Sequence, residues 1–90
     1  MNISNEDVAS IVVEIPEGHH HLRSTVTLRD GTELTFQEAT ISNLLRAFVG
    51  VKTHPTRRRI ELRGREVTEG VKHGFANWQL LEEGGSDEKI

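Results

Sequence analysis

Three early stretches of the chain have the residue patterns of β-strands, and two of them alternate between apolar and polar residues. Residues 8–15 are rich in β-branched side chains and are followed by Pro16, so they predict a short strand. Residues 21–28 alternate strictly, and a second alternating run with Leu34 and Phe36 follows an Asp-Gly dipeptide. Two alternating runs joined by a turn dipeptide predict a β-hairpin.

The faces of the side chains predict the length of the hairpin loop. A two-residue loop would turn Leu34 to the face opposite Val26 and Leu28, because a one-residue shift in register turns every side chain over. A three-residue loop that ends in Gly31 keeps these apolar side chains on one face, and it fits a type I turn closed by a left-handed glycine. We predict the three-residue loop, with Val26 opposite Leu34.

Residues 41–49 carry the clearest helical pattern. Their apolar side chains recur at i, i+3, i+4, i+7 and i+8, which forms one stripe along a helix. The members of this stripe are Ile41, Leu44, Leu45, Phe48 and Val49. We expect an N-cap at Thr40 and a helix end at Gly50.

Residues 56–65 combine the densest positive charge of the chain with a short apolar alternation. As a strand, this segment turns Ile60 and Leu62 to one face, because strand side chains alternate. The opposite face then carries Glu61 and a row of four arginines, namely Arg57, Arg59, Arg63 and Arg65. This strand would have a core side and a guanidinium side.

Residues 74–81 allow two interpretations. Phe75, Trp78 and Leu81 fit helical spacing, but Gly74 weakens a helix. We favour a strand or an extended segment here, with a short second helix near the C-terminus as the alternative. The size of Trp78 favours a buried position in so lean a chain. Exposed beside Phe75, it would instead mark an interface.

These elements predict an α+β fold in a single domain over residues 8–83. An antiparallel sheet of four to five strands would pack one face on the main helix, Ile41–Val49, and leave the arginine face in solvent. Residues 1–7 are expected to be loose. The polar residues 84–90 are expected to form a disordered tail.

The composition limits what the chain can do. It has 90 residues, 34% of them hydrophobic, with three Phe, one Trp and no Tyr, so its core is lean and its stability marginal unless it oligomerises. Cysteine is absent, which excludes disulfides and thiolate metal sites. The N-terminus is polar and no apolar run approaches about 18 residues, so we expect a cytoplasmic protein without a membrane partner.

Charge is distributed unevenly along the chain. The net charge is −3, yet residues 46–73 carry most of the Lys and Arg residues, and the acidic residues are concentrated on either side of them. Such asymmetry indicates an anionic partner for the middle of the chain. The alternative is that the acidic ends lie beside the basic middle and neutralise it.

The arginine row is the first candidate site. Alternate residues of a strand lie about 6.5–7 Å apart, a spacing comparable to that of successive phosphates, and guanidinium groups bind phosphate bidentately. The candidate residues are Arg57, Arg59, Arg63 and Arg65, with Lys52, His54 and Lys72 at the ends of the row. They would bind a polyanion without reading bases. The alternative is that these arginines pair with acidic side chains of a neighbouring strand.

Metal and catalytic chemistry have weaker signals. His19 and His21 would share a face of a strand, and these two imidazoles are the weak alternative candidates for a metal site. Structural zinc takes four ligands, so we expect no metal or cofactor. None of the serines lies in a glycine-flanked elbow, and no glycine-rich phosphate motif is present. We therefore expect no enzyme.

Two functions remain open. The first is a non-enzymatic module for protein interaction or assembly, including self-association. The second is binding of nucleic acid or another polyanion through the strand from Arg57 to Arg65.

Overall fold

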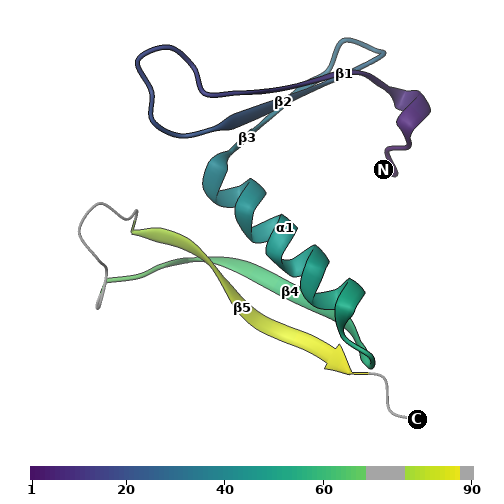
Figure 1. The fold of residues 1–90 in the computed structure, drawn as a ribbon, viewed down its shortest axis with the longest axis vertical. Coiled ribbons are helices and arrows are strands. Elements are labelled where there is room, and N and C mark those ends of the chain that lie inside the picture. Colours follow the sequence, from purple (N-terminus) through teal and green to yellow (C-terminus); the bar gives the residue numbers. More distant parts are fainter. Residues whose placement is uncertain (69–76, 88–90) are drawn as a thin grey trace. The chain divides into compact units, whose positions relative to one another are not determined.

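The computed structural model describes residues 1–68 and 77–87. In these ranges the fold is α+β, with one α-helix and five strands (Figure 1). The strands form two antiparallel sheets of three and two strands, rather than the single sheet of four to five strands expected from the sequence. The chain forms two compact units, Met1–Ser42 and Asn43–Ile90. Each unit is described by itself.

The first unit contains a three-stranded antiparallel sheet in the order β1-β2-β3. A short 3-10 helix precedes it at Asn5–Asp7, and the strands are β1 (Val8–Glu14), β2 (Arg23–Leu28) and β3 (Glu33–Gln37). The strand predicted for residues 8–15 and the two strands of the predicted hairpin are thus confirmed.

The three-residue loop between β2 and β3 is also confirmed. Val26 lies opposite Leu34. The backbone N–H of Leu28 donates to the carbonyl of Thr32 at 2.8 Å, and the N–H of Gly31 donates to the carbonyl of Leu28 at 3.0 Å. Gly31 has a φ of 92°, the left-handed conformation that closes such a turn.

The buried part of the first unit centres on β2. Among the described residues of the chain, the buried ones are Leu28, with 7% of its surface exposed, and Ser24. Ile11 and Val13 of β1 remain more than half exposed. The core of this sheet is therefore small.

The helix α1 spans Glu38–Thr53 and is longer at both ends than the sequence predicted. Thr40 lies inside it and is not the N-cap. The helix begins at Glu38 instead, and the carboxylate of this residue is bound to His21 and Leu22. An acidic side chain in the first turn also suits the positive end of the helix dipole.

Gly50 does not end the helix as predicted. A glycine in a helix interior costs only about 1 kcal/mol relative to alanine, so three further residues can still join. Pro55 disfavours the helical conformation of His54, the residue before it, and the helix ends at Thr53.

The second unit holds an antiparallel hairpin of β4 (Arg57–Glu66) and β5 (Trp78–Asp87). The strand predicted for the basic segment is confirmed. The strand β5 runs from Trp78 to Asp87, so it continues past residue 84, where we expected a disordered tail to begin. The rest of the alternative second helix lies outside the described residues.

The strand β4 approaches α1 at Gly50. Ile60 Cδ1 lies 3.0 Å from the position that a Cβ on Gly50 would occupy. This glycine therefore makes room for a close approach between strand and helix.

Among the described residues, no helix is both long enough and apolar enough to cross a membrane.

Candidate interaction surfaces

A bulge at the start of β4 divides the arginines between two faces of the hairpin. The register against β5 shifts by one residue between Arg57 and Arg59. Because such a shift turns side chains over, these two arginines lie on opposite faces. The guanidinium group of Arg57 pairs with Glu82, away from the other members of the predicted row.

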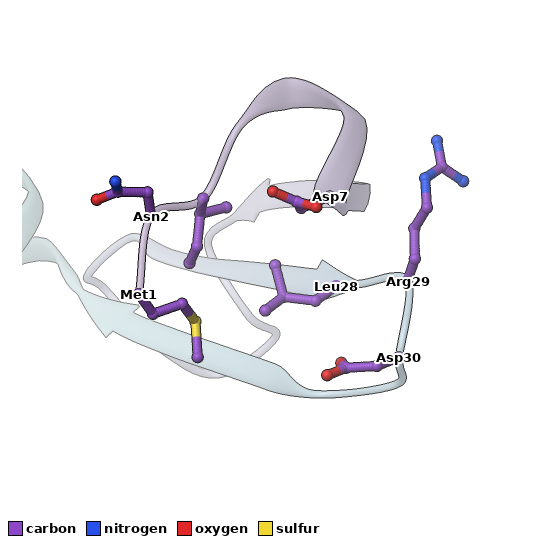
Figure 2. Close-up of a pocket in the computed structure, with 7 residues that line it drawn as sticks. Met1, Asn2, Asp7, Leu28, Arg29 and Asp30 are labelled. Atoms are coloured by element: carbon purple, nitrogen blue, oxygen red, sulfur yellow. The ribbon is translucent and has the colours of Figure 1, made fainter.

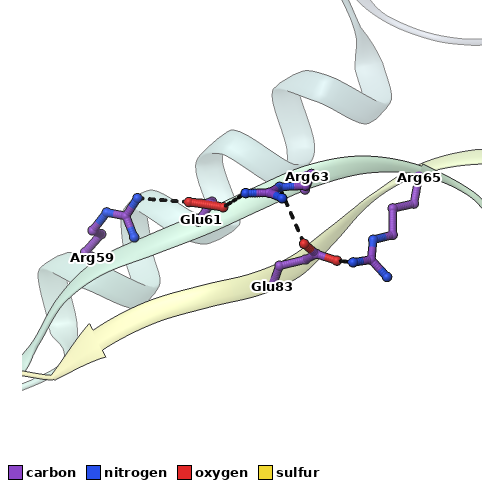
Figure 3. A network of polar contacts seen from close by, with 5 residues as sticks. All are labelled: Arg59, Glu61, Arg63, Arg65 and Glu83. Carbon is purple, nitrogen blue, oxygen red and sulfur yellow. Dashed lines mark hydrogen bonds and ion pairs between the residues drawn. The ribbon is translucent and has the colours of Figure 1, made fainter.

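The remaining arginines form an alternating network with two carboxylates (Figure 3). Glu61 accepts from Arg59 at 2.9 Å and from Arg63 at 2.7 Å. Glu83 lies 3.4 Å from Arg63 Nε and also pairs with Arg65. The three guanidinium groups remain more than half exposed, but two carboxylates offset most of their charge. Glu83 comes from the neighbouring strand β5, as in the alternative in which the arginines pair with acidic side chains of a neighbour, whereas Glu61 lies on β4 itself.

A second irregularity of the hairpin brings Glu83 into this network. The register shifts between Glu61 and Leu62, so Glu83 is an extra residue on β5. Its side chain is 17% exposed, the lowest value among the five members. The hydrogen bonds from Arg59 and Arg63 hold the pKa of Glu61 below its ordinary value.

A basic hollow lies where α1 ends and β4 begins. It is lined by Val51, Lys52, His54, Arg57 and Arg58. Three of the predicted polyanion-binding residues, Lys52, His54 and Arg57, meet here, and Arg58 joins them. Lys72 lies outside the described residues.

The imidazole of His54 holds the turn beside this hollow. His54 Nδ1 accepts a hydrogen bond from the backbone N–H of Arg57 at 2.9 Å and another from that of Thr56 at 3.2 Å. This nitrogen is thus occupied by the backbone. His54 serves to orient the entry into β4.

The stripe on α1 is largely exposed, in contrast to the core position expected for it. The exposed fractions are 64% for Leu44, 58% for Leu45, 57% for Phe48 and 53% for Val49, and we call these four residues the exposed stripe. An apolar groove runs beside it, lined by Leu44, Ala47, Phe48, Val51, Lys52 and Ile60. The hairpin covers the helix at Gly50 and leaves this stripe open.

Trp78 is also exposed rather than buried. It begins β5 opposite Glu66, and 66% of its surface is accessible. An exposed position is what an interface role requires of it. Phe75, its predicted companion, lies outside the described residues.

The histidine run lies in the first unit, along a hollow that His19, His21 and Glu38 help to line. His21 Nδ1 is 2.8 Å from Glu38 Oε2, and the backbone N–H of Leu22 donates to Glu38 Oε1 at 3.2 Å. The contact with His21, followed by that with Leu22, lowers the pKa of Glu38. Within the described ranges, no group of three or more His, Cys, Asp or Glu residues is arranged to hold a metal ion.

Another hollow lies beside the end of β2, where Asp7, Leu28 and Asp30 meet the N-terminal residues (Figure 2). Asp7 accepts hydrogen bonds from the N–H and the hydroxyl of Ser4 at 2.9 and 3.0 Å. Asp30 accepts from the N–H of Thr32 at 2.9 Å. These bonds lower the pKa of both carboxyl groups, which hold the turns that frame Leu28.

Comparisons with models of protein families, with curated proteins and with solved structures found no match. The proposals that follow therefore rest on the geometry of this chain.

Proposed function

We propose that this chain is a non-enzymatic module for protein interaction or assembly and that the exposed stripe of α1 is its contact surface. The observation that carries the proposal is the exposure of Leu44, Leu45, Phe48 and Val49, each above one half. These four side chains are contiguous on one helix face. A contiguous apolar surface of this kind is typical of an interaction site.

The energetics support this role. Complete burial of one such side chain contributes about 1.5–3 kcal/mol of free energy. Because each side chain is about half exposed, about half of this free energy remains to be gained at each position when a partner covers the stripe. The groove beside Ile60 adds shape to the surface, since it places a depression next to Phe48. Lys52 borders the groove with an aliphatic stem and a charged end, as is usual at the rim of an interface.

Cysteine labelling tests whether the exposed stripe is available to a partner. The chain contains no cysteine, so Leu45→Cys and Glu17→Cys each provide a single reactive site, the second in an exposed loop as a control. At nanomolar protein concentration, we expect both thiols to react with a maleimide at similar rates. If Cys at position 45 were protected even at this dilution, the stripe would be an internal core and the proposal would fail.

The basic hollow supports a second candidate function, the binding of a polyanion. Lys52 and Arg58 come together there from two elements, beside Arg57, whose guanidinium group is paired with Glu82. Neutralising about two phosphates would give binding that weakens with salt, with a log–log slope of about −1.4 to −1.8. This surface is smaller than the row of four arginines predicted from the sequence.

Fluorescence polarisation with labelled single-stranded RNA and DNA at two salt concentrations tests the second candidate. We expect binding at low salt that is lost in a Lys52→Glu/Arg58→Glu variant and kept in an Arg23→Glu variant, which alters an exposed arginine of β2. Equal loss in both variants would indicate a non-specific effect of charge. The absence of binding at low salt would remove this candidate.

A further inference from the structure

We infer that the surface which covers the exposed stripe is a second copy of this chain, with the two α1 helices packed antiparallel about a two-fold axis. This inference rests on the proposed function, since it names the partner of the same surface. Its two supports are the symmetry of the stripe and the weak packing of the second unit.

The stripe reads nearly the same in both chain directions. Two adjacent apolar residues, Leu44 and Leu45, are followed by two other positions and then by two adjacent apolar residues, Phe48 and Val49. A two-fold interface requires that residue i contacts residue j of the other copy and that j contacts i. Antiparallel pairing meets this condition, because Leu45 lies opposite Phe48 of the second copy and Leu44 opposite Val49 of the second copy.

The second unit needs an additional surface to be stable. Its sheet is a two-stranded hairpin, and neither α1 nor β4 has a buried residue. A two-stranded hairpin is marginal in water unless a packed apolar face supports it. A second helix across the exposed stripe would supply that face, and the antiparallel orientation also opposes the two helix dipoles favourably.

Sedimentation equilibrium of the whole chain tests the inference. Between about 1 and 100 μM, the range of typical micromolar dimers, we expect the mean mass to approach twice the mass of one chain. We also expect the thermal midpoint to rise with protein concentration, because dissociation and unfolding are linked by mass action.

Two variants locate the interface. Leu45→Arg places a charge at the centre of the stripe, and it is expected to remain monomeric throughout this range. Arg46→Glu changes a charge on the same helix away from the stripe, so it should assemble as the natural chain does. Circular dichroism of each variant establishes that the helix is kept.

Each outcome decides a specific claim. A natural chain that stays monomeric at every concentration overturns the second copy as the partner, while the labelling of position 45 still decides whether the stripe is an interaction surface. A chain that dimerises equally well with Leu45→Arg overturns the helix pairing. Dimerisation that is lost in Leu45→Arg alone supports it.

Discussion

Ile60 and Gly50 are held together so closely that Ile60 Cδ1 lies 3.0 Å from where a Cβ on Gly50 would stand. A Cβ atom at residue 50 would therefore lie closer to Ile60 than ordinary van der Waals contact allows. The strand β4 thus meets α1 at the one position of the helix that has no side chain. The opposite demands of helix propensity and packing at this position can be measured.

Gly50→Ala is expected to leave stability nearly unchanged. Alanine favours a helix by about 0.8–1 kcal/mol over glycine, but its methyl group would press on Ile60. In an Ile60→Val background, which removes Cδ1, Gly50→Ala should stabilise the folded chain by close to the full difference in helix propensity. Urea denaturation of the four proteins measures this coupling. Equal effects of Gly50→Ala in both backgrounds would show that the two residues are not in contact.

Gly31→Ala is expected to destabilise the β2–β3 hairpin by about 1–2 kcal/mol. Gly31 has a φ of 92° and no atom within 4 Å of a built Cβ, so the cost comes from the backbone alone. Gly64→Ala is the control, since that glycine lies in β4 with ordinary contacts and without a positive φ. A neutral Gly31→Ala in thermal denaturation would contradict the left-handed turn.

Acid is expected to weaken the second unit through Glu61. Hydrogen bonds from Arg59 and Arg63 lower its pKa in the folded chain, so the unfolded chain binds the proton more readily. This contribution to stability is complete above the unfolded pKa and disappears as the pH falls through the folded pKa. Glu61→Gln should therefore differ most from the natural chain near neutral pH and converge with it in acid.

Denaturation of Glu61→Gln at several pH values checks this sign. Glu66→Gln, at the end of the same strand, is a matched control for the loss of one negative charge. A difference between Glu61→Gln and the natural chain that grows as the pH falls would be the opposite of what the network predicts.

Trp78 is expected to be accessible to acrylamide in the folded chain. It is the single tryptophan and 66% of its surface is exposed, so its fluorescence should be quenched nearly as well as that of the unfolded chain. A strongly protected indole would place Trp78 in a core or an interface. Repeating the measurement at higher protein concentration shows whether self-association covers it.

Local patterns predicted the strands well, because alternation and turn residues act over short distances. The register of Val26 against Leu34 followed from the need to keep apolar side chains on one face. The strand nature of the basic segment followed from the alternation around Ile60 and Leu62. These features depend on neighbours within a few residues.

The arrangement of the candidate site depended on features that composition does not reveal. A bulge between Arg57 and Arg59 split the predicted row, and a second shift brought Glu83 between Arg63 and Arg65. Such bulges arise where two strands meet, so no single segment encodes them.

The stripe illustrates a different limit of prediction. Its helical spacing predicted that an apolar face would be covered, but this pattern is the same whether the cover is the chain's own sheet or another protein. The helix end predicted at Gly50 was wrong for a related reason. A glycine near a helix end predicts a stop, whereas here it admits Ile60.

The labelling rate of Leu45→Cys as a function of protein concentration tests the role of the exposed stripe most directly. We expect rapid reaction at nanomolar concentration and a rate that falls about tenfold once nine-tenths of the chain is dimeric, because only the free chain reacts. The Glu17→Cys control should react at one rate throughout. Slow reaction of the thiol at position 45 at every concentration would contradict the account, since the stripe would then be covered within a single chain.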